Sequence, residues 1–510
     1  MSDEAAAQLL RSDCPLVLIE AAAGCGKTFQ GAAYAEDVAS SLGDGRVLIL
    51  THTHGACGVF AERTKRVSGK VEIRTIDALI AQIATAYHKS LDLPHDMASW
   101  AWQNDGEGFK TMAAKSAAFL DAQPMVAKAL ARRYPVVICD EHQDSSADQH
   151  AVVMALYRGG SRLRIFGDPL QRIYDARSEL EARRGRERWE AIRAAAVCEK
   201  LDSPHRWKDG CPELGQWILY ARTCLENEEP IDLTSNRPAS VRVLTGNNLS
   251  RAHAVYQLSN EHRRPIDSLV NQSDQLMILA SHNDLIRALR AFLGRRISIW
   301  EGHTRGALAA LVDVLRNQSG DAEALAAGVT EFMGCIGVGF SANSHGDRLL
   351  KEVREGCVRS TVGKPANIQE VARRIVEVPS HVGVAAALEL IRTLVEEQRP
   401  GFDHVKIDHR VELRDAIRLG QFTSADDAFS EIVRKRSYAR PTPPSRTLSS
   451  IHKAKGLECD NVLLMACDNA QFSSTSYARC KLYVALSRAK RSLTLVVPTT
   501  NPSSLFKVRS

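Results

Sequence analysis

The chain reads Leu16-Val17-Leu18-Ile19-Glu20-Ala21-Ala22-Ala23-Gly24-Cys25-Gly26-Lys27-Thr28 near its N-terminus, an apolar run followed by a Gly-rich turn that ends in Gly-Lys-Thr. Backbone N–H groups of a tight turn that opens onto a helix N-terminus converge on phosphate oxygens. Lys27 would neutralise charge on the β- and γ-phosphates, and the Thr28 hydroxyl would ligate Mg²⁺. Ala21 stands where the strict pattern has its first glycine, and a small residue there still lets the turn close. The stretch therefore predicts a strand, a nucleotide-binding loop from Ala21 to Thr28, and a helix.

A second apolar run, Pro135-Val136-Val137-Ile138-Cys139, ends in acidic residues. It has no polar face, so it is predicted to be a strand buried in a parallel sheet. Ligands bind beyond the carboxyl ends of such strands, where this chain places Asp140 and Glu141. Asp140 would hold Mg²⁺, and Glu141 would polarise an attacking water. Together the two stretches predict a Mg²⁺-dependent nucleoside triphosphatase.

Composition limits the classes of protein that fit. The sequence has 510 residues, of which 44% are hydrophobic, and its formal net charge is +6. This length predicts about three or four domains, and the mildly basic charge favours a polyanionic partner. No apolar run approaches the roughly 20 residues that a membrane span needs, and Met1 to Leu10 lacks the regions of a signal peptide. We therefore expect a cytoplasmic protein that does not contact a membrane.

The twelve cysteines form no Cys-x-x-Cys pair, so the sequence predicts neither a zinc ribbon nor an iron–sulfur cluster. In a reducing compartment they would be free thiols. Cys25 is a special case because a thiol inside an anion-binding turn at a helix N-terminus should have a lowered pKa. We expect alkylation of Cys25 to inhibit nucleotide hydrolysis, with bound nucleotide giving protection.

Asp140-Glu141-His142-Gln143-Asp144 resembles the Asp-Glu-x-Gln-Asp box, motif II, of superfamily 1 DNA helicases of the UvrD/Rep/PcrA type. The other boxes of that family are present in the family's order. They are Thr51-His52-Thr53-His54-Gly55-Ala56 (motif Ia), Thr75-Ile76-Asp77-Ala78-Leu79 (Ib), Gly167-Asp168-Pro169-Leu170-Gln171-Arg172-Ile173-Tyr174 (III), Pro204-His205-Arg206-Trp207 (IV), Ile451-His452-Lys453-Ala454-Lys455-Gly456-Leu457-Glu458 (V) and Tyr483-Val484-Ala485-Leu486-Ser487-Arg488-Ala489-Lys490 (VI). Ordered boxes over nearly the whole chain make the resemblance specific.

The resemblance implies roles for residues around a bound ATP–Mg²⁺. Gln171 resembles the family's γ-phosphate sensor, and Arg206 and Arg488 resemble the two arginines that reach the γ-phosphate from the second lobe. The fork geometry and permanent charge of arginine suit a transition state whose charge spreads over phosphoryl oxygens. Gly456 and Glu458 resemble the motif V residues that lie near the ribose and the γ-phosphate. Hydrolysis is thereby expected to be coupled to closure of the two lobes.

The resemblance also implies that motifs Ia, Ib, III and V contact single-stranded DNA. The candidate DNA-binding residues are Thr51, His54, Thr75, Asp77, Tyr174 and His452. Such contacts go mainly to the backbone and to stacked bases, so binding is expected to depend on salt and to show little sequence preference.

Three positions depart from the family pattern. The family usually carries a glutamine about twenty residues before the phosphate-binding loop to read adenine, whereas Met1 to Asp13 contains only Gln8. His205 stands where an aromatic residue, usually Tyr, stacks on the base. The run Asp175-Ala176-Arg177 lacks the aromatic that stacks on a DNA base after motif III. Base–aromatic stacking contributes roughly 1–3 kcal/mol per base, so a weaker grip on the strand is expected.

The resemblance implies an α/β fold with two RecA-like P-loop NTPase lobes, 1A and 2A, and mainly helical insertions, a reduced 1B and a 2B. Prolines at Pro441, Pro443 and Pro444 mark the exit from the second insertion because proline disfavours a continuing helix. The expected division is residues 1–82 and 127–200 for lobe 1A, 83–126 for insertion 1B, 201–290 and 445–510 for lobe 2A, and 291–444 for insertion 2B.

The function implied by the resemblance is that of an ATP-dependent DNA helicase or translocase moving 3′ to 5′ on single-stranded or tailed DNA. Motif VI ends at Lys490 and the sequence at Ser510, so we expect no nuclease domain on this chain. The layout resembles the UvrD-like subunit that is encoded beside a nuclease in Gabija-type anti-phage defence, and a role in DNA repair is the other possibility.

An alternative is an ATP-gated DNA-end sensor or scaffold that controls a partner nuclease with little unwinding of its own. A pseudo-ATPase is disfavoured because the predicted catalytic residues are all present. DNA-stimulated hydrolysis and strand displacement distinguish these interpretations.

Overall fold

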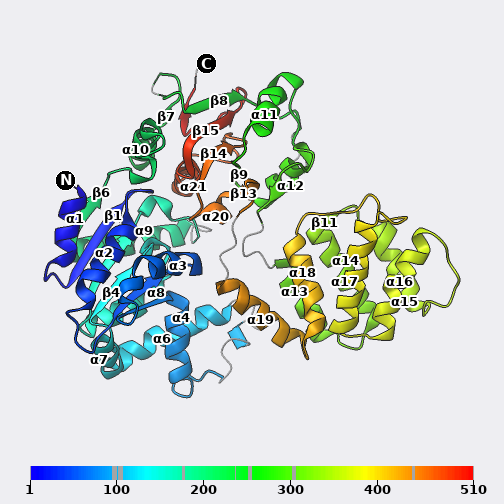
Figure 1. Ribbon diagram of the computed structural model, residues 1–510, viewed down its shortest axis with the longest axis horizontal. Helices are drawn as coiled ribbons and strands as arrows, with labels where there is room; N and C mark the ends of the chain where they lie inside the picture. The colour runs from blue at the N-terminus through cyan, green and yellow to red at the C-terminus, as the bar shows by residue number, and fades with distance from the viewer. Residues whose placement is uncertain are drawn as a thin grey trace. The chain divides into compact units, whose positions relative to one another are not determined.

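The computed structural model describes residues 2–94, 100–101, 107–174, 179–235, 237–250, 255–300, 306–438 and 443–508. The chain divides into two compact units (Figure 1). Met1–Trp300 and Thr442–Ser510 form one of them, the two-sheet unit, and Glu301–Pro441 form the other, the helical unit.

The first sheet of the two-sheet unit has six parallel strands in the order β3-β2-β4-β5-β1-β6. The strands are β1 (Leu16–Ala21), β2 (Val47–Thr51), β3 (Val71–Thr75), β4 (Val136–Cys139), β5 (Arg162–Gly167) and β6 (Val197–Leu201). Alternate residues of β1 enter different cores: Leu18 packs on one face of the sheet and Ile19 on the other. This burial on both faces explains the uninterrupted apolar runs, and it confirms the buried parallel strand predicted before Asp140.

Helices cover both faces of this sheet. One face packs against α1 (Ser2–Arg11), α2 (Lys27–Ala39) and α3 (His54–Arg63). The opposite core receives residues of α4 (Ile76–Ala86), α6 (Glu107–Ala122), α7 (Pro124–Arg133), α8 (Ala147–Arg158) and α9 (Glu179–Ala195). Short helical turns are η1 (Lys65–Val67), η2 (His142–Asp144) and η3 (Pro169–Gln171). The result is a three-layer α/β lobe whose loops after β1, β2, β3 and β4 meet at one edge.

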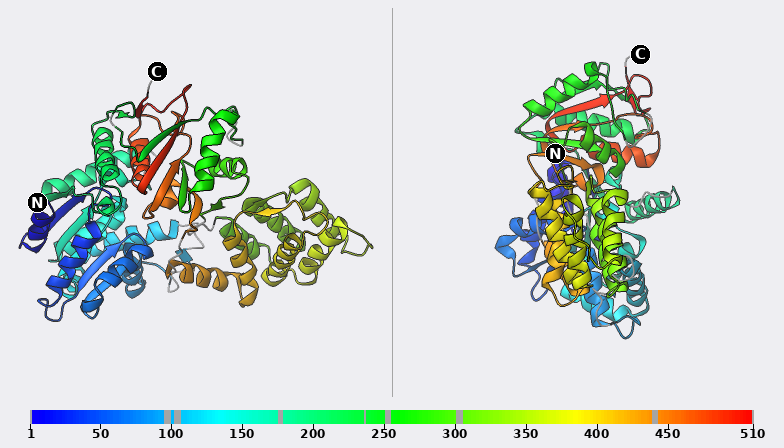
Figure 2. Two further views of the ribbon diagram at one scale, coloured as in Figure 1. Left: turned by 45° about the horizontal axis from the view of Figure 1, so that its top comes forward. Right: turned by 90° about the vertical axis from the view of Figure 1, so that its right-hand side faces the viewer.

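The second sheet also has six parallel strands, in the order β10-β13-β9-β14-β15-β8. They are β8 (Val241–Thr245), β9 (Leu276–Ala280), β10 (Ser298–Ile299), β13 (Arg446–Ser450), β14 (Cys459–Leu464) and β15 (Ala489–Val497). Strands that precede the helical unit in sequence, drawn green in Figure 2, lie beside orange and red strands that follow it. The helical unit is therefore inserted in the sequence of this lobe, between β10 and β13.

The helices of the second lobe are η4 (His205–Trp207), α10 (Pro212–Glu226), α11 (Asn260–Gln272), α12 (Asn283–Phe292), α20 (Ile451–Ala454) and α21 (Ser476–Leu486). A small two-stranded sheet pairs β7 (Ile231–Asp232) with β16 (Phe506–Lys507). Ala23 and Ile173 of the first lobe are buried in the core of the second, so the two lobes share apolar packing.

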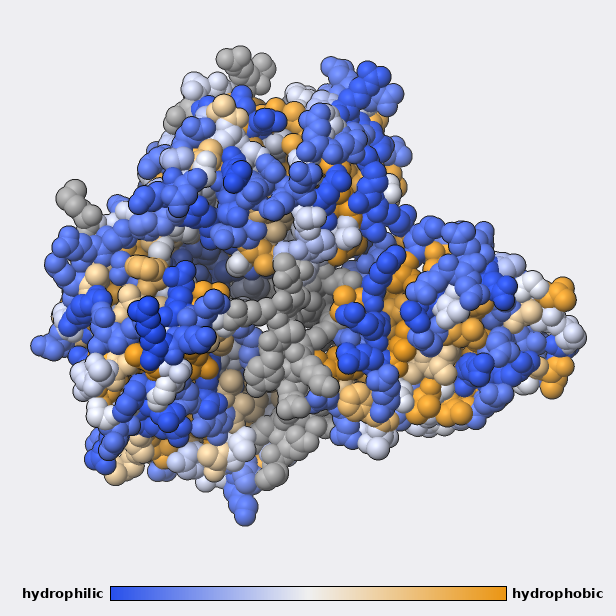
Figure 3. All heavy atoms as spheres, viewed as in Figure 1, coloured by the Kyte–Doolittle hydropathy of each residue, from blue (hydrophilic) through white to orange (hydrophobic). Residues whose placement is uncertain are grey.

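The helical unit contains α13 (Gly306–Asn317), α14 (Ala322–Ile336), α15 (Asp347–Arg354), α16 (Lys364–Glu377), α17 (His381–Glu396), α18 (Arg410–Arg418) and α19 (Ala425–Tyr438), with η5 (Ala342–Gly346), η6 (Leu419–Gln421) and a short antiparallel pair, β11 (Gly337–Val338) and β12 (Lys406–Ile407). Polar side chains cover most of the face seen in Figure 3, with apolar side chains in smaller groups. Among the described residues, the most exposed large apolar side chains are Val358 and Val362, 82% and 84% exposed, in the loop before α16. The α/β fold class with a mainly helical insertion is confirmed.

Candidate nucleotide-binding and DNA-binding site

The phosphate-binding loop connects β1 to α2, which begins at Lys27. Gly24 and Gly26 have φ angles of +74° and +89°, in the left-handed region that glycine adopts readily. A Cβ atom on Gly24 would also lie only 2.8 Å from the Cβ atom of Arg206. Backbone conformation therefore requires both glycines, and the loop presents its N–H groups at a helix N-terminus, which favours phosphate.

Lys27 is buried beside this loop, with its side chain 8% exposed. Its Nζ donates to the carbonyl oxygen of Ala21 at 3.0 Å and lies 3.5 Å from Oε1 of Glu141. Burial disfavours the ammonium form, but the nearby carboxylates, above all that of Glu141, raise the pKa of Lys27 above its usual value. Lys27 is thus a cation at neutral pH, as a phosphate ligand must be.

Asp140 directly follows β4, and Thr28 is the second residue of α2. The Asp140 carboxylate is buried, and its Oδ1 accepts a hydrogen bond from the N–H of Glu141 at 3.1 Å. Burial, together with the charge of Glu141, raises the pKa of Asp140. Carboxylate and hydroxyl oxygens are ligands that Mg²⁺ prefers, and a divalent cation would offset this surplus of negative charge. These residues therefore fit a Mg²⁺–nucleotide.

Glu141 is held by strained backbone and by a hydrogen bond. Its φ angle is +53°, a conformation that costs a non-glycine residue of order 1–3 kcal/mol. The side-chain amide of Gln143 donates to Glu141 Oε2 and accepts from the N–H of Asp168 at 3.0 Å. Burial disfavours the carboxylate, but Lys27 and Lys455 lower the pKa of Glu141 below its usual value. Glu141 is therefore ionised and oriented, as a group that polarises water requires.

Gln171 is held by a buried aspartate that also binds the second lobe. The Nε2 of Gln171 donates to Asp168 Oδ2 at 3.0 Å. The other oxygen of Asp168 accepts from an Arg222 Nη at 3.2 Å. Arg222 lies on α10, so this ion pair joins the lobes next to Gln171. Asp168 therefore connects the side chain of Gln171 to Arg222 of the second lobe.

Arg206 lies in η4 of the second lobe and touches the phosphate-binding loop. Its backbone N–H donates to the carbonyl oxygen of Gly24 at 3.1 Å. Its Nε lies 2.5 Å from Oε2 of Glu458, and an Nη donates to the carbonyl oxygen of Ser487 at 2.7 Å. The guanidinium is thus held by Glu458 and Ser487 next to the phosphate-binding loop.

Arg488 is buried at the end of α21, with 2% of the residue exposed. Its guanidinium donates to the Val484 carbonyl oxygen, the Leu457 carbonyl oxygen and the Ser487 hydroxyl at 2.8, 3.1 and 2.7 Å. Burial, with Arg206 nearby, lowers the pKa of Arg488 to about 10. The side chain therefore stays charged at neutral pH and is pre-positioned by three oxygen atoms of its own lobe.

Two aromatic side chains of the second lobe contact the phosphate-binding loop. The phenol oxygen of Tyr483, on α21, accepts a hydrogen bond from the N–H of Ala23 at 2.9 Å. Trp207 is fully buried, lies against Gly24, and donates from Nε1 to the carbonyl oxygen of Ala489 at 2.7 Å. The loop that would bind phosphate is therefore in direct contact with both lobes.

His205 and Gly456 lie at the margins of this site. A Cβ atom on Gly26 would be 3.3 Å from Cδ2 of His205, so the imidazole lies over the loop. His205 Nε2 is 2.8 Å from Oδ2 of Asp3 on α1. Gly456 has a φ angle of +81° in the turn that leads to Glu458. A Cβ atom on Gly456 would meet no neighbour within 4 Å. The turn therefore favours glycine because of its positive φ angle and not because space is lacking.

Thr51 and Thr75 end the adjacent strands β2 and β3 and pair in register. Both side chains are buried. The Thr51 hydroxyl donates to the carbonyl oxygen of Thr53 at 3.0 Å, while the Thr75 hydroxyl accepts from the N–H of Ala78 and caps α4. The sheet brings these two predicted DNA-binding residues together, and their hydroxyls are engaged by neighbouring backbone.

His54 is the first residue of α3, and Asp77 is the second residue of α4, which directly follows Thr75. Burial lowers the pKa of His54, and the charge of Asp77 opposes that shift, which places the two side chains in one electrostatic neighbourhood. Asp77 Oδ1 accepts a hydrogen bond from Gln149 Nε2 at 2.7 Å.

Tyr174 and His452 are brought together from different lobes. Tyr174 is 44% exposed, and its hydroxyl donates to the carbonyl oxygen of His452 at 3.4 Å. The two ring centroids are 6.4 Å apart, and His452 Nε2 lies 2.7 Å from the hydroxyl of Tyr477. The run Asp175-Ala176-Arg177 lies outside the described residues.

Two family models match the chain. The UvrD/REP helicase N-terminal domain matches residues 96–179, and the UvrD-like helicase C-terminal domain matches residues 447–496. The chain therefore carries UvrD/Rep-like helicase domains of superfamily 1A. Its two parallel sheets are accordingly the RecA-like lobes of an ATP-dependent DNA helicase. No curated protein matches the chain closely enough to count as a relative.

Lys455 also belongs to this UvrD/Rep-like site, although its place in motif V predicted no role for its side chain. Its ammonium forms an ion pair with Asp144 and donates to the carbonyl oxygen of Gln171 at 2.6 Å. It also lies 5.0 Å from the ring centroid of Tyr174. Lys455 was visible as part of the motif V segment, whereas Arg222, which also joins the lobes, lies in none of the quoted motifs.

The expectation of a lowered pKa for Cys25 is wrong. Burial raises the pKa of the Cys25 thiol to about 12, against the lowering effect of Lys27. The thiol has no exposed surface, and its sulfur lies 3.8 Å from the carbonyl oxygen of Ala23. Enclosure by packed side chains outweighs the helix N-terminus, so Cys25 is a small structural residue of this helicase.

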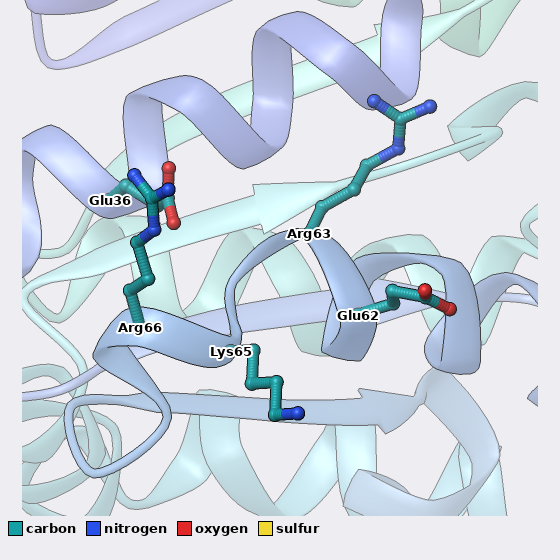
Figure 4. A pocket seen from close by; sticks show the side chains of 5 residues that line it. All are labelled: Glu36, Glu62, Arg63, Lys65 and Arg66. Atoms are coloured by element: carbon teal, nitrogen blue, oxygen red, sulfur yellow. The ribbon is translucent and has the colours of Figure 1, made fainter.

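A separate hollow of about 620 Å³ lies on the first lobe (Figure 4). It is lined by Glu36, Glu62, Arg63, Lys65 and Arg66 from α2, α3 and η1. None of the predicted site residues lines it. Across the part of the chain that the structure describes, no cluster of three or more His, Cys, Asp or Glu residues could hold a metal ion. Nor does any described helix combine the length and the apolar character needed to cross a membrane.

Proposed function

We propose that this UvrD/Rep-like helicase couples ATP hydrolysis to 3′-to-5′ movement on single-stranded DNA. The observation that carries the proposal is the direct contact of second-lobe groups with the phosphate-binding loop. Arg206 and Tyr483 hydrogen-bond to Gly24 and Ala23 from the other lobe. Any change in the loop on binding or losing a γ-phosphate would alter these contacts, and the lobes would move. The direction of movement rests on the family resemblance alone.

In this proposal ATP binds as its Mg²⁺ complex, and the metal ion supplies Lewis-acid charge stabilisation at the phosphates. Lys27 binds phosphate oxygens, while Thr28 and Asp140 hold the ion. Glu141 polarises the attacking water, because its carboxylate is ionised and oriented by Gln143.

Groups around the catalytic residues complete the proposed site. Gln171 senses the γ-phosphate through its contact with Asp168. Arg206 and Arg488 stabilise the charge that develops on the transferring phosphoryl group. His205, Gly456 and Glu458 border the nucleoside. The proposed DNA path runs past the loops that hold His54 and Asp77 and past Tyr174 and His452.

We assign residues 1–82 and 127–200 to lobe 1A, 83–126 to insertion 1B, 201–290 and 445–510 to lobe 2A, and 291–444 to insertion 2B. The two sheets and the compact unit Glu301–Pro441 support the order of lobes and insertions. Because β10 (Ser298–Ile299) pairs with β13 in the second sheet, the helical unit begins after β10, within the range 291–444. We place the protein in the cytoplasm, in DNA repair or in anti-phage defence of the Gabija type, with a partner nuclease.

An ATP-gated sensor that controls a partner nuclease is the second candidate function. Ala176 favours it, because this residue stands where the family usually carries an aromatic that stacks on a DNA base, and such stacking contributes roughly 1–3 kcal/mol per base. In this alternative, nucleotide and DNA ends would set the affinity for the nuclease, and unwinding would be weak.

Steady-state ATPase of the purified chain, with and without single-stranded DNA, tests the proposal. Strong stimulation that is abolished in Glu141→Gln and Lys27→Ala is the expected result. Displacement of a strand from a duplex with a 3′ tail, but not with a 5′ tail, would support the motor. DNA-stimulated hydrolysis without displacement would favour the sensor, and absence of hydrolysis with or without a partner would contradict both.

A further inference from the structure

A row of hydrogen-bonded side chains joins the loop after β2 to the loop after β4. His52 Nε2 lies 3.1 Å from the hydroxyl of Ser145, which lies 3.2 Å from Nδ1 of His142. His142 Nε2 lies 3.0 Å from Nδ1 of His150 on α8. We call His52, Ser145, His142 and His150 the histidine row.

The centre of the histidine row is closed to solvent. His142 is 3% exposed and Ser145 is 4% exposed. A neutral imidazole has one N–H donor and one acceptor nitrogen, so His142 donates to one neighbour and accepts from the other. Donors and acceptors therefore follow one another along the row. A change in the hydrogen bond of His52 to Ser145 would alter the hydrogen bond of Ser145 to His142. Buried networks of this kind hold their members in place because a lost partner leaves a polar atom unpaired.

Two members of the row, His142 and His52, belong to the two activities proposed for this site. His142 is the first residue of η2 and lies between Glu141, which would polarise water, and Gln143, which orients Glu141. His52, at one end of the row, lies between Thr51 and Thr53, and the Thr53 hydroxyl caps α3 at the N–H of Ala56. This end is the motif Ia segment, through which DNA contact is expected.

We propose that His52 and Ser145 are positioning residues that transmit DNA binding at the motif Ia segment to Glu141 through His142. Displacement of the motif Ia loop by a bound strand shifts His52, and the histidine row passes that shift to the η2 turn that holds the hydrolytic carboxylate. The inference rests on the proposed function as a DNA-dependent ATPase. It deepens that function by naming side chains through which DNA would raise the rate of hydrolysis.

Three substitutions test the row. His52→Phe keeps an aromatic ring and removes Nε2, whereas His52→Gln retains a polar nitrogen near that position. Ser145→Ala removes the hydroxyl that links the two imidazoles. Ser116→Ala is the matched control, because Ser116 is fully buried on α6 and its hydroxyl has no hydrogen-bond partner in the described structure.

The experiment measures ATPase rates without DNA and with increasing single-stranded oligothymidylate. We expect His52→Phe and Ser145→Ala to retain the rate without DNA and the DNA concentration for half-maximal stimulation. Their maximal stimulated rates should fall roughly 3- to 10-fold, the range typical of coupling through a few contacts. His52→Gln should recover part of the loss, and the double variant should lose no more than either single variant, because both act on one connection.

A stimulated rate equal to that of the wild type in His52→Phe and Ser145→Ala would overturn the inference. A parallel fall of the rates with and without DNA, together with a lower midpoint of thermal unfolding, would assign the row a purely structural role and would also overturn it. If the wild-type protein hydrolyses ATP without any stimulation by DNA, the proposed function itself fails, and the inference fails with it.

Discussion

Lys455→Met is expected to destabilise the two-sheet unit strongly. The side chains of Lys455 and Asp144 are 8% and 3% exposed, so their ion pair is almost completely removed from water. Methionine keeps most of the length of the lysine side chain and removes its charge, so the buried Asp144 carboxylate loses the ammonium of Lys455. Breaking a buried pair in this way costs about 3–5 kcal/mol. The carbonyl oxygen of Gln171 also loses its donor.

Urea unfolding followed by tryptophan fluorescence measures this loss, because Trp207 and Trp217 are buried in the same unit. Lys490→Met is the matched control. Lys490 lies 3.1 Å from Asp460, but the two side chains are 37% and 23% exposed. Such a solvent-screened pair contributes at most about 1 kcal/mol. The same chemical change should therefore have a several-fold smaller effect on the free energy of unfolding.

A second substitution tests the electrostatic cause. Asp144→Asn in the Lys455→Met background removes the negative charge that faced Lys455, so the double variant should be more stable than Lys455→Met alone. Equal losses of stability in Lys455→Met and Lys490→Met would contradict this electrostatic explanation. So would a further loss of stability when Asp144→Asn is added to Lys455→Met.

Three further predictions concern the nucleotide site. Gly456→Ala should lower the free energy of unfolding by about 1–2 kcal/mol, because alanine is strained at a φ of +81°. Gly69→Ala is the control in the same urea assay and should have little effect, because Gly69 has open space around it and no positive φ angle. Cys25 should react with iodoacetamide far more slowly than the exposed Cys335 at pH 8, whether or not ATP is present, because its pKa is raised to about 12; rapid labelling of Cys25 in a peptide map would contradict this. Arg488→Ala should lower kcat for DNA-stimulated hydrolysis about a thousandfold and change ATP binding little, and a variant with wild-type kcat would remove Arg488 from the catalytic site.

The sequence predicted the parts of the fold that local patterns control. The apolar runs that became β1 and β4 could be recognised because strands buried on both faces carry no polar alternation. Gly24 and Gly26 were recognisable because the phosphate-binding turn needs positive φ angles there. Asp140 and Glu141 followed from their place at the carboxyl end of a predicted parallel strand.

The prediction for Cys25 failed because it considered one local effect alone. A helix N-terminus and Lys27 do favour the thiolate, but complete burial disfavours it more strongly. Burial depends on residues from distant parts of the chain that pack over the loop, and no local pattern reports it.

By itself, the sequence determined which segments form strands, which turns need glycine, and which residue types could bind ATP and Mg²⁺, since these depend on neighbouring residues in the chain. Only the tertiary structure decided which of these groups meet. Tyr483 is 460 residues from Ala23, and Lys455 is 311 residues from Asp144, yet each pair forms a direct contact. Such contacts depend on how two lobes pack together, and this packing joins the phosphate-binding loop to both lobes.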